Sequence, residues 1–213
     1  GRRFVDLGGH HRRLAIGQRR DALARCRHAH ATRFECGRHV GAFERTQQDT
    51  FQVVDTQGLF PNEDGIFGTP YRETLLTVKG TMNINASNYL TVRYGRNENS
   101  QPYGADARTP VSGWGESGNS FNSFNVNHNW VLGGSKLNEI VFQYADFSNA
   151  ITANSTDPTQ IFPNGVAVGQ NGNTPQATQQ KKWQFRDDFS WRLEGKGGIG
   201  HDMKAGFNYI HEP

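Results

Sequence analysis

Apolar and polar residues alternate strictly along several stretches of this chain, and that alternation constrains its fold more than any other feature. Between Leu76 and Asn85 every even position is apolar or glycine, and every odd position is Thr, Lys or Asn. A period of two places successive side chains on opposite faces of an extended chain, so the pattern predicts a strand with one apolar and one polar face. Similar alternation recurs over residues 90–95, 123–132, 139–145, 182–193 and 203–209. The sequence therefore predicts an all-β, up-and-down antiparallel meander of about six strands, each of about ten to thirteen residues.

The composition excludes several other classes of protein. The chain contains 25 Gly, 18 Asn and 13 Gln, yet 11% of its residues are aromatic, and a disordered chain should be poor in aromatics. No stretch approaches the roughly 18 consecutive apolar residues of a transmembrane helix, and no signal peptide is visible at the N-terminus. Polar amides, glycine and aromatic residues together suit long β-strands with one wetted face.

Charge is distributed unevenly along the chain, which predicts two segments. Residues 1–46 hold eleven Arg, no Lys and four acidic residues, a net charge of +7, whereas residues 47–213 have a net charge of −4. We expect residues 1–46 to be disordered or translated out of frame, and residues 47–213 to form the β domain. A basic arm for nucleic acid or lipid headgroups is a second interpretation of residues 1–46, but the segment lacks interleaved aromatic residues and a helical stripe longer than two turns. A zinc site is a third, but its candidate ligands match no usual spacing; they are Cys26, His28, His30, Cys36 and His39.

Short motifs give no support for catalysis or for a cofactor. Residues 195–200 satisfy the G-x-G-x-x-G pattern, but a strand and not a helix is expected to follow, so they predict a turn. Residues 62–65 lack the ligand series of a calcium loop and also predict a turn. Asp187 and Asp188 point to opposite faces of one strand and cannot act together on one substrate atom. We therefore expect no enzymatic activity, no bound metal and no cofactor.

The lengths of the connections add a second constraint on the fold. Those near 86–88, 133–136 and 194–200 are short, and those over 97–118 and 148–180 are long and rich in Gly, Asn, Pro, Thr and Gln. Because short and long connections alternate, an up-and-down sheet collects all the short turns at one end and all the long loops at the other. Transmembrane β-barrels have this asymmetry. Strands of about 9–11 residues also suffice to cross a membrane when tilted near 45°.

Aromatic residues near strand ends predict a girdle at the two membrane surfaces. Trp183 and Trp191 lie eight residues apart on the same face, about 26 Å along the strand, or about 19 Å along the membrane normal once the strand is tilted. They can therefore lie near opposite edges of an apolar band about 25 Å tall. The residues predicted to form this girdle are Tyr89, Trp130, Trp183, Trp191 and Tyr209. The alternative is a soluble β-sandwich, in which one face of shorter strands packs on a second sheet and the two ends are not asymmetric.

Several segments resemble the barrel of TonB-dependent outer-membrane receptors. They are LTVRYGRN at 90–97, NVNHNW at 125–130 and KWQFRDDFSW at 182–191, and HDMKAGFNY at 201–209 resembles the H-D-x-K-x-G strand opening of that superfamily. The nearest branch is the Oar-like receptors, which carry a carboxypeptidase-regulatory-like domain before the plug. The resemblance covers residues 51–213. Family members also have a signal peptide, a TonB box, a plug and a barrel of about 22 strands, so this chain is expected to be an internal barrel fragment.

The resemblance implies a receptor in the outer membrane that binds or imports a ligand too large for porins, with energy supplied through TonB by way of the plug. The implied partners are outer-membrane lipid, the TonB system and a small ligand such as a sugar, a peptide or a siderophore, and not nucleic acid. We expect ligand contacts from the lumen-facing side of the strand at 182–193 and from the long loops, at Tyr103, Trp114, Lys182, Gln184, Arg186 and Asp188. Two alternatives are a soluble or surface-attached carbohydrate-binding or adhesin module without a membrane span, and a broken reading frame without activity.

Overall fold

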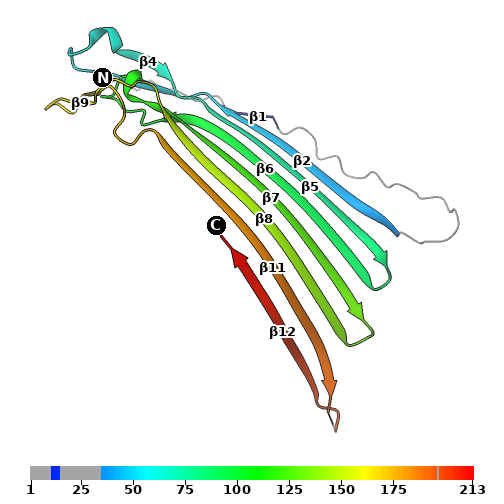
Figure 1. Ribbon diagram of the computed structural model, residues 1–213. Helices are drawn as coiled ribbons and strands as arrows, with labels where there is room; N and C mark the ends of the chain where they lie inside the picture. Colours follow the sequence, from blue (N-terminus) through cyan, green and yellow to red (C-terminus); the bar gives the residue numbers. More distant parts are fainter. Residues whose placement is uncertain (1–10, 15–34, 196) are drawn as a thin grey trace.

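The computed structural model describes residues 11–14, 35–195 and 197–213 (Figure 1). Its main element is one antiparallel sheet in which seven long strands follow one another in chain order, with a short strand beside the first. The predicted all-β antiparallel meander is therefore confirmed. The strands are β1 (His11–Leu14), β2 (Glu35–Gln48), β5 (Tyr71–Asn85), β6 (Asn88–Tyr103), β7 (Gly115–Leu132), β8 (Lys136–Ala153), β11 (Gln176–Glu194) and β12 (Gly200–His211).

Most of the strands are longer than the alternation predicted. β5 and β6 have 15 and 16 residues, β7 and β8 have 18 each, and β11 has 19. Most of the additional residues lie at the end of the sheet that carries the long connections, where polar residues occur on both faces. Pairing of β6 with β7, for example, continues to Tyr103 opposite Gly115. Backbone ladders do not require an apolar side chain, so a hydrophobic pattern marks only the part of a strand with an apolar face.

Strand β2 corrects the prediction for the N-terminal segment. It pairs with β5 from Arg38 opposite Thr81 to Gln48 opposite Tyr71, so residues 35–46 belong to the sheet and are not unstructured. Neither face of β2 is purely apolar, because Phe43 and Arg45 share one face and Val40 and Glu44 share the other. This mixture hid the strand from a search for alternation. Residues 1–10 and 15–34, which include Cys26, His28 and His30, lie outside the described residues.

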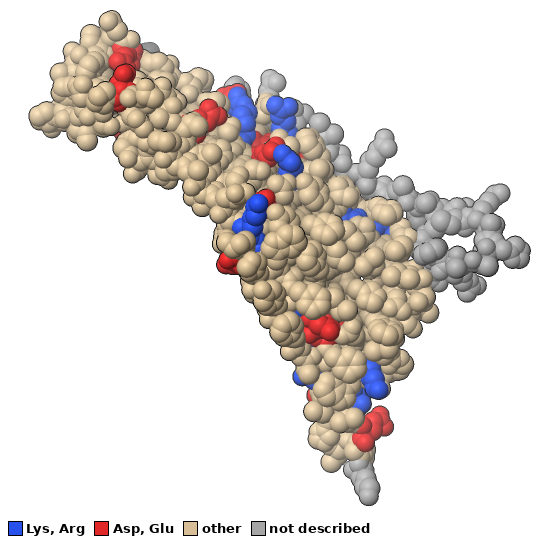
Figure 2. Space-filling model, in the orientation of Figure 1, with Lys and Arg blue, Asp and Glu red and all other residues tan. Residues whose placement is uncertain are grey.

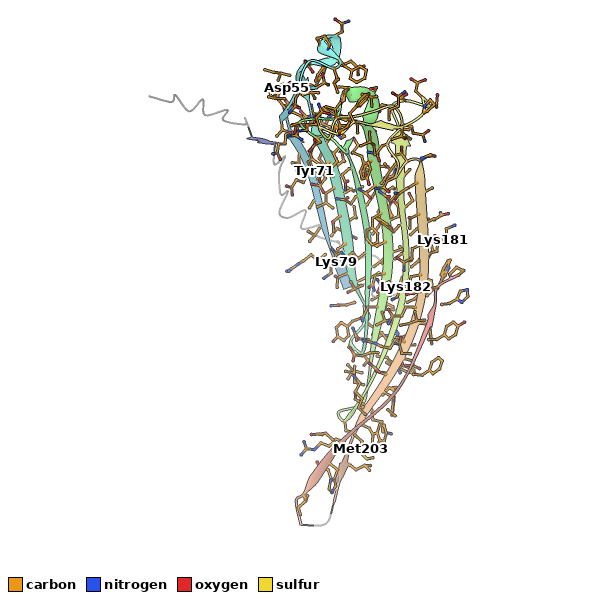
Figure 3. All side chains as sticks on the ribbon, turned by 90° about the vertical axis from the view of Figure 1, so that its left-hand side faces the viewer. Asp55, Tyr71, Lys79, Lys181, Lys182 and Met203 are labelled. Atoms are coloured by element: carbon orange, nitrogen blue, oxygen red, sulfur yellow. The ribbon has the colours of Figure 1, made fainter. Side chains whose placement is uncertain are left out.

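The register gives the sheet one apolar and one polar face. A cross-strand row on one side contains Val92, Val126, Phe142 and Phe185, and the neighbouring row on the other side contains Arg93, Asn125, Gln143 and Gln184. We call these two sides the apolar face and the polar face. Asp187 lies on the apolar face opposite Ile140, and Asp188 lies on the polar face opposite Glu139, as the alternation predicted. Figure 3 likewise shows Lys181 and Lys182 on opposite sides of β11.

The two ends of the sheet differ in the way that the connection lengths predicted. Two- to five-residue turns join β5 to β6, β7 to β8 and β11 to β12 at one end, and the three long connections lie at the other (Figure 1). The Gly-rich run at 195–200 is a turn followed by strand β12, as expected. Gly197 and Gly198 have positive φ angles of 86° and 79° there, a conformation that glycine adopts at little cost.

The three long connections form a small cap at their end of the sheet. The cap consists of residues 49–70, 104–114 and 154–175, and it holds β3 (Phe51–Val54), β4 (Gly65–Gly68), β9 (Gln160–Ile161), β10 (Ala167–Val168) and the 3₁₀ turns η1 (Pro61–Glu63) and η2 (Val111–Gly113). The Asp55 N–H donates to the Ala107 carbonyl at 2.8 Å, and Arg108 Nη1 donates to the Asn164 carbonyl at 2.5 Å. Long-range bonds of this kind tie the three connections into one unit.

The most deeply buried side chains among the described residues lie in this cap. Val54, Thr56, Pro110 and Val166 have almost no accessible surface, and Trp114 is 2% exposed. Phe60 and Phe162 pack edge to face with ring centroids 5.6 Å apart, which joins the first connection to the third. Residues 62–65 form the predicted turn within the cap, where Asp64 Oδ1 accepts the Thr56 N–H at 2.6 Å. The cap is therefore a folded unit with its own core.

Candidate functional site

An aromatic row borders the apolar face on the side nearest the cap. Tyr94, Phe124, Tyr144 and Trp183 occupy adjacent positions on four neighbouring strands. The Tyr144 and Trp183 rings pack at 4.3 Å between centroids. The next row toward the cap is polar, and it consists of Arg96, Asn122, Asp146 and Lys181.

The phenol groups of the aromatic row turn toward this polar row. Tyr94 Oη donates to Asn122 Oδ1 at 3.0 Å, and Tyr144 Oη donates to Asp146 Oδ2 at 3.3 Å. An aromatic ring with its body against apolar neighbours and its hydroxyl against polar ones suits a boundary between an apolar and an aqueous environment.

Within the described residues, no layer of protein covers the apolar face. Trp183 and Phe185 on β11 are 43% and 41% exposed, and Phe207 on β12 is 60% exposed. Seen from its edge, the sheet is a single layer with the cap at one end (Figure 3). Figure 2 shows a face of the sheet whose middle carries few charged residues, while Lys, Arg, Asp and Glu gather nearer its two ends. Contiguous apolar surface of this extent normally marks contact with a membrane or a partner.

The short turns are staggered along the strand direction. The size of this stagger gives the angle between the line through the turns and the perpendicular to the strands. The last pair of the β5–β6 hairpin is level with Trp130 of β7, two residues before the final β7–β8 pair of Leu132 and Lys136. Lys136 pairs with Trp191, three residues before the final β11–β12 pair at Glu194. The stagger is five residues over four strand-to-strand steps. At about 3.3 Å per residue and about 4.8 Å per strand, the line through the turns lies about 41° from the perpendicular to the strands.

Four of the five predicted girdle residues share the apolar face. Trp130, Trp183, Trp191 and Tyr209 all lie on it. Tyr89 does not, because it pairs with Asn129 on the polar face and its hydroxyl donates to the Ala86 carbonyl at 3.2 Å. Its position near a strand end suggested a girdle residue. Alternation, however, places its side chain on the polar face and that of its neighbour Leu90 on the apolar face. Membrane contact by the other four stays a prediction.

The predicted lumen-facing residues of β11 lie together on the polar face and are bound to β12 and the residues beyond it. Lys182 Nζ is 3.0 Å from Glu212 Oε1, and Gln184 Nε2 donates to Asn208 Oδ1 at 3.0 Å. Asp188 Oδ2 lies 3.1 Å from Lys204 Nζ and 3.4 Å from Arg186 Nε. This strip is a network of ion pairs, in which the buried Arg186 Nε lies beside Asp188 but makes no hydrogen bond.

The two predicted loop residues have different environments. Trp114 is buried, its indole N–H donates to the Thr109 carbonyl at 2.7 Å, and Phe67 packs edge to face against it. A ligand cannot reach this ring, so the prediction of ligand contact was wrong for Trp114. The residue belongs to the cap core, where Phe67 of the first connection packs against it. Tyr103 is half-buried at the end of β6, on the polar face.

A row of hydrogen-bonded amides crosses the polar face just below the cap, and the sequence alone did not reveal it. Asn149 Nδ2 donates to Asn119 Oδ1, and Asn119 Nδ2 donates to Asn99 Oδ1, both at 2.9 Å. Asn99 Nδ2 donates to Asn97 Oδ1 at 3.1 Å, and Asn97 Nδ2 donates to Glu73 Oε1 at 2.8 Å. We call these five residues the amide row. Their long sequence separations are closed only by the register of β5 to β8, so no local motif could have identified them.

The cap overlies the polar face next to the amide row. One row closer to the cap, Ser117 and Ile151 on the polar face are 7% and 8% exposed, while their neighbours Glu116 and Thr152 on the other face are exposed. Burial of the Tyr71 phenol, and then the nearby Glu73 carboxylate, raise the pKa of Tyr71 above its ordinary value of 10.0. The amide row therefore lies at the edge of a partly enclosed region.

Comparisons with known proteins give no family for this chain. A scan against protein-family models and searches of curated proteins and of solved structures find no match. None of the helices in the described part is long and apolar enough to cross a membrane. Nor do the described residues contain a group of three or more His, Cys, Asp or Glu side chains placed to hold a metal ion. The resemblance to TonB-dependent receptors stays a prediction.

Proposed function

We propose that the sheet is part of a transmembrane β-barrel of an outer-membrane receptor of the TonB-dependent type. Its apolar face would contact lipid, its polar face would line the lumen, and the cap would lie outside the cell over the lumen. The observation that carries this proposal is the uncovered apolar face bordered by the row of Tyr94, Phe124, Tyr144 and Trp183. An antiparallel sheet with one face in lipid and one in water shows this division of side chains.

The stagger of the turns supports the same proposal. If the turns lie in one plane parallel to the membrane, the strands tilt about 41° from its normal, within the range of about 35–45° seen in outer-membrane barrels. The sheet of described residues has open edges at β12 and at the β2 side, so further strands, from the same protein or from other copies of the chain, must complete a barrel. Uptake of a ligand through TonB rests on the resemblance of the strand sequences alone.

Tryptophan fluorescence in brominated lipid tests the orientation of the sheet. The chain has four Trp residues, of which Trp130, Trp183 and Trp191 lie on the apolar face and Trp114 lies in the cap core. Four single-Trp variants of the full chain, with the other three changed to Phe, would be refolded into phosphatidylcholine vesicles with and without bromine on the acyl chains.

We expect bromine to quench the three apolar-face Trp residues and to leave Trp114, the internal control, unquenched. A chain that stays in solution without lipid, with the same three residues unquenched by bromolipid, would instead support a soluble or surface-attached binding module. One feature favours that second candidate: Asp187 lies in the middle of the apolar stretch of β11, where its Oδ1 accepts the Asn138 amide at 2.5 Å. A carboxylate is unusual on a lipid-facing surface.

A further inference from the structure

We propose that the amide row beneath the cap binds a neutral carbohydrate chain. The amide row consists of Glu73, Asn97, Asn99, Asn119 and Asn149. The inference deepens the proposed function by naming the ligand class, and it rests on that function in taking the polar face as the lumen.

The hydrogen bonds of the amide row leave both donors and acceptors available. Each of Asn99 and Asn119 uses one N–H to bond the next member and one oxygen lone pair to accept from the previous member. A side-chain amide has two N–H groups and two lone pairs, so each of these residues keeps one of each. Sugar hydroxyls both donate and accept, and a line of amides can therefore serve successive hydroxyl groups.

The row is also ordered along one direction. Every amide from Asn149 to Asn97 donates toward Glu73, so the chain of bonds ends on a carboxylate, the strongest acceptor in the row. Bonds that point the same way polarise one another, which makes the remaining donors and acceptors of the row stronger partners. The side chains are half-buried and are held by neighbouring strands, so little ordering is needed when a ligand binds.

Charge argues for a neutral ligand. The strand register continues the row with Thr46 on β2 and Thr178 on β11, so it carries no Lys or Arg across six strands. An anionic ligand such as a ferric siderophore or an acidic sugar would meet the Glu73 carboxylate and, in the register row of Asn97, the carboxylate of Glu44. The nearest polar-face cation on β11 is Lys182, two rows farther from the cap and paired with Glu212.

Aromatic rings lie beside the amides on the same face. Phe121 and Phe147 face each other across β7 and β8 in the next row away from the cap, and Phe121 is 38% exposed. Binding sites commonly combine apolar or aromatic surface with a few placed polar groups. The C–H face of a sugar ring can stack on Phe121 while its hydroxyls contact the amides, an arrangement suited to neutral sugars.

Saturation-transfer NMR and calorimetry on the full chain test the proposal. The chain would be folded in a detergent without a sugar headgroup, such as a polyoxyethylene ether, because maltosides and glucosides would compete. The probes are maltohexaose, cellohexaose and mannohexaose, with an alginate hexamer as an acidic comparison. We expect at least one neutral hexamer to bind and the alginate hexamer not to bind.

A matched pair of double variants locates the site. N119A with N149A interrupts the amide row, and we expect it to weaken binding at least tenfold. N127A with N129A removes a second amide pair on the polar face of β7, in which Asn129 donates to Asn127 at 2.6 Å, and we expect it to leave binding unchanged. Circular dichroism of both variants checks that the sheet is intact.

Two outcomes overturn the inference: no neutral hexamer binds, or the two double variants weaken binding equally. Bromolipid quenching is independent of sugar binding, so the two proposals fail separately. If the chain binds sugar but bromolipid does not quench its apolar-face Trp residues, the membrane-barrel proposal fails and the carbohydrate-site proposal stands.

Discussion

Substitution of Asp187 by Leu should stabilise the protein in a lipid bilayer. Asp187 lies midway between Trp183 and Trp191 on the apolar face of β11, and its polar contact among the described side chains is the Asn138 amide. The two Trp residues are about 26 Å apart along the strand, or about 20 Å along the normal at a tilt of about 41°. Asp187 is therefore about 10 Å from either edge of the apolar band, near the position where charge costs most.

Three contributions determine how much Asp187→Leu should change the free energy of unfolding. A lipid-facing Lys or Arg at the midplane costs about 2–4 kcal/mol and an acidic residue costs less, so removal of the carboxylate should gain about 1.5 kcal/mol. Loss of the hydrogen bond to Asn138 costs about 0.5–1.5 kcal/mol. The Leu side chain adds up to about 1.5–3 kcal/mol of apolar burial in lipid. The expected net gain is about 1.5–4 kcal/mol, and Asp187→Asn, which keeps the hydrogen bond without the charge, should gain less.

Urea unfolding of vesicle-inserted protein, followed by tryptophan emission, measures this difference. Asp188→Leu on the adjacent residue is the matched control, because it removes the partner of Lys204 on the polar face and should lower the unfolding midpoint. The two neighbouring substitutions are thus expected to have opposite signs. If Asp187→Leu leaves the midpoint unchanged or lowers it, the apolar face does not contact lipid and the reasoning from the aromatic row fails.

Other predictions concern the cap and its attachment to the sheet. Trp114→Ala should cost about 3–5 kcal/mol and melt the cap, which faster trypsin cleavage within residues 104–114 would reveal. Gly115→Ala places a Cβ 2.1 Å from a backbone oxygen of β8, and should lower the free energy of unfolding by about 1–3 kcal/mol. Gly118→Ala on the same strand places its Cβ 4.0 Å from the nearest atom and should be nearly neutral, and thermal unfolding compares the two variants. The raised pKa of Tyr71 stabilises the folded state fully below pH 10.0 and progressively less as the pH rises through the folded-state pKa, so Tyr71→Phe should reduce the loss of stability at high pH in a urea–pH titration.

The sequence predicted the parts of the fold in which one face of a strand is apolar throughout. In β11, Trp183, Phe185, Phe189 and Trp191 repeat every second residue with Asp187 as the one polar interruption, and the structure places them on one face. β2 was missed because polar and apolar residues are mixed on both of its faces. Its place in the sheet depends on backbone pairing with β5, which leaves no periodic signal.

The cap and the amide row could not be predicted, for a related physical reason. Val54, Pro110 and Val166 come from three separate connections and become a core only when the strands bring those connections to one end. Asn99, Asn119 and Asn149 are each an ordinary polar position of an alternating strand. Only the register, which a single sequence does not reveal, places them in one row.

The location of buried residues implies that the cap and the sheet depend on different sources of stability. The sheet is a single layer, and the aromatic side chains that mark its apolar face, such as Trp183 and Phe207, are about half exposed, so hydrophobic burial must come from whatever covers that face. The cap buries Val54, Trp114 and Val166 within itself and needs no such cover. Delipidation should therefore unfold the strands before it disrupts the cap, and a cap that persists in the absence of lipid would keep its overhang beside the amide row. Whatever covers the apolar face then determines whether the strands, and with them the polar face, are folded. The cap determines how much of the polar face is covered.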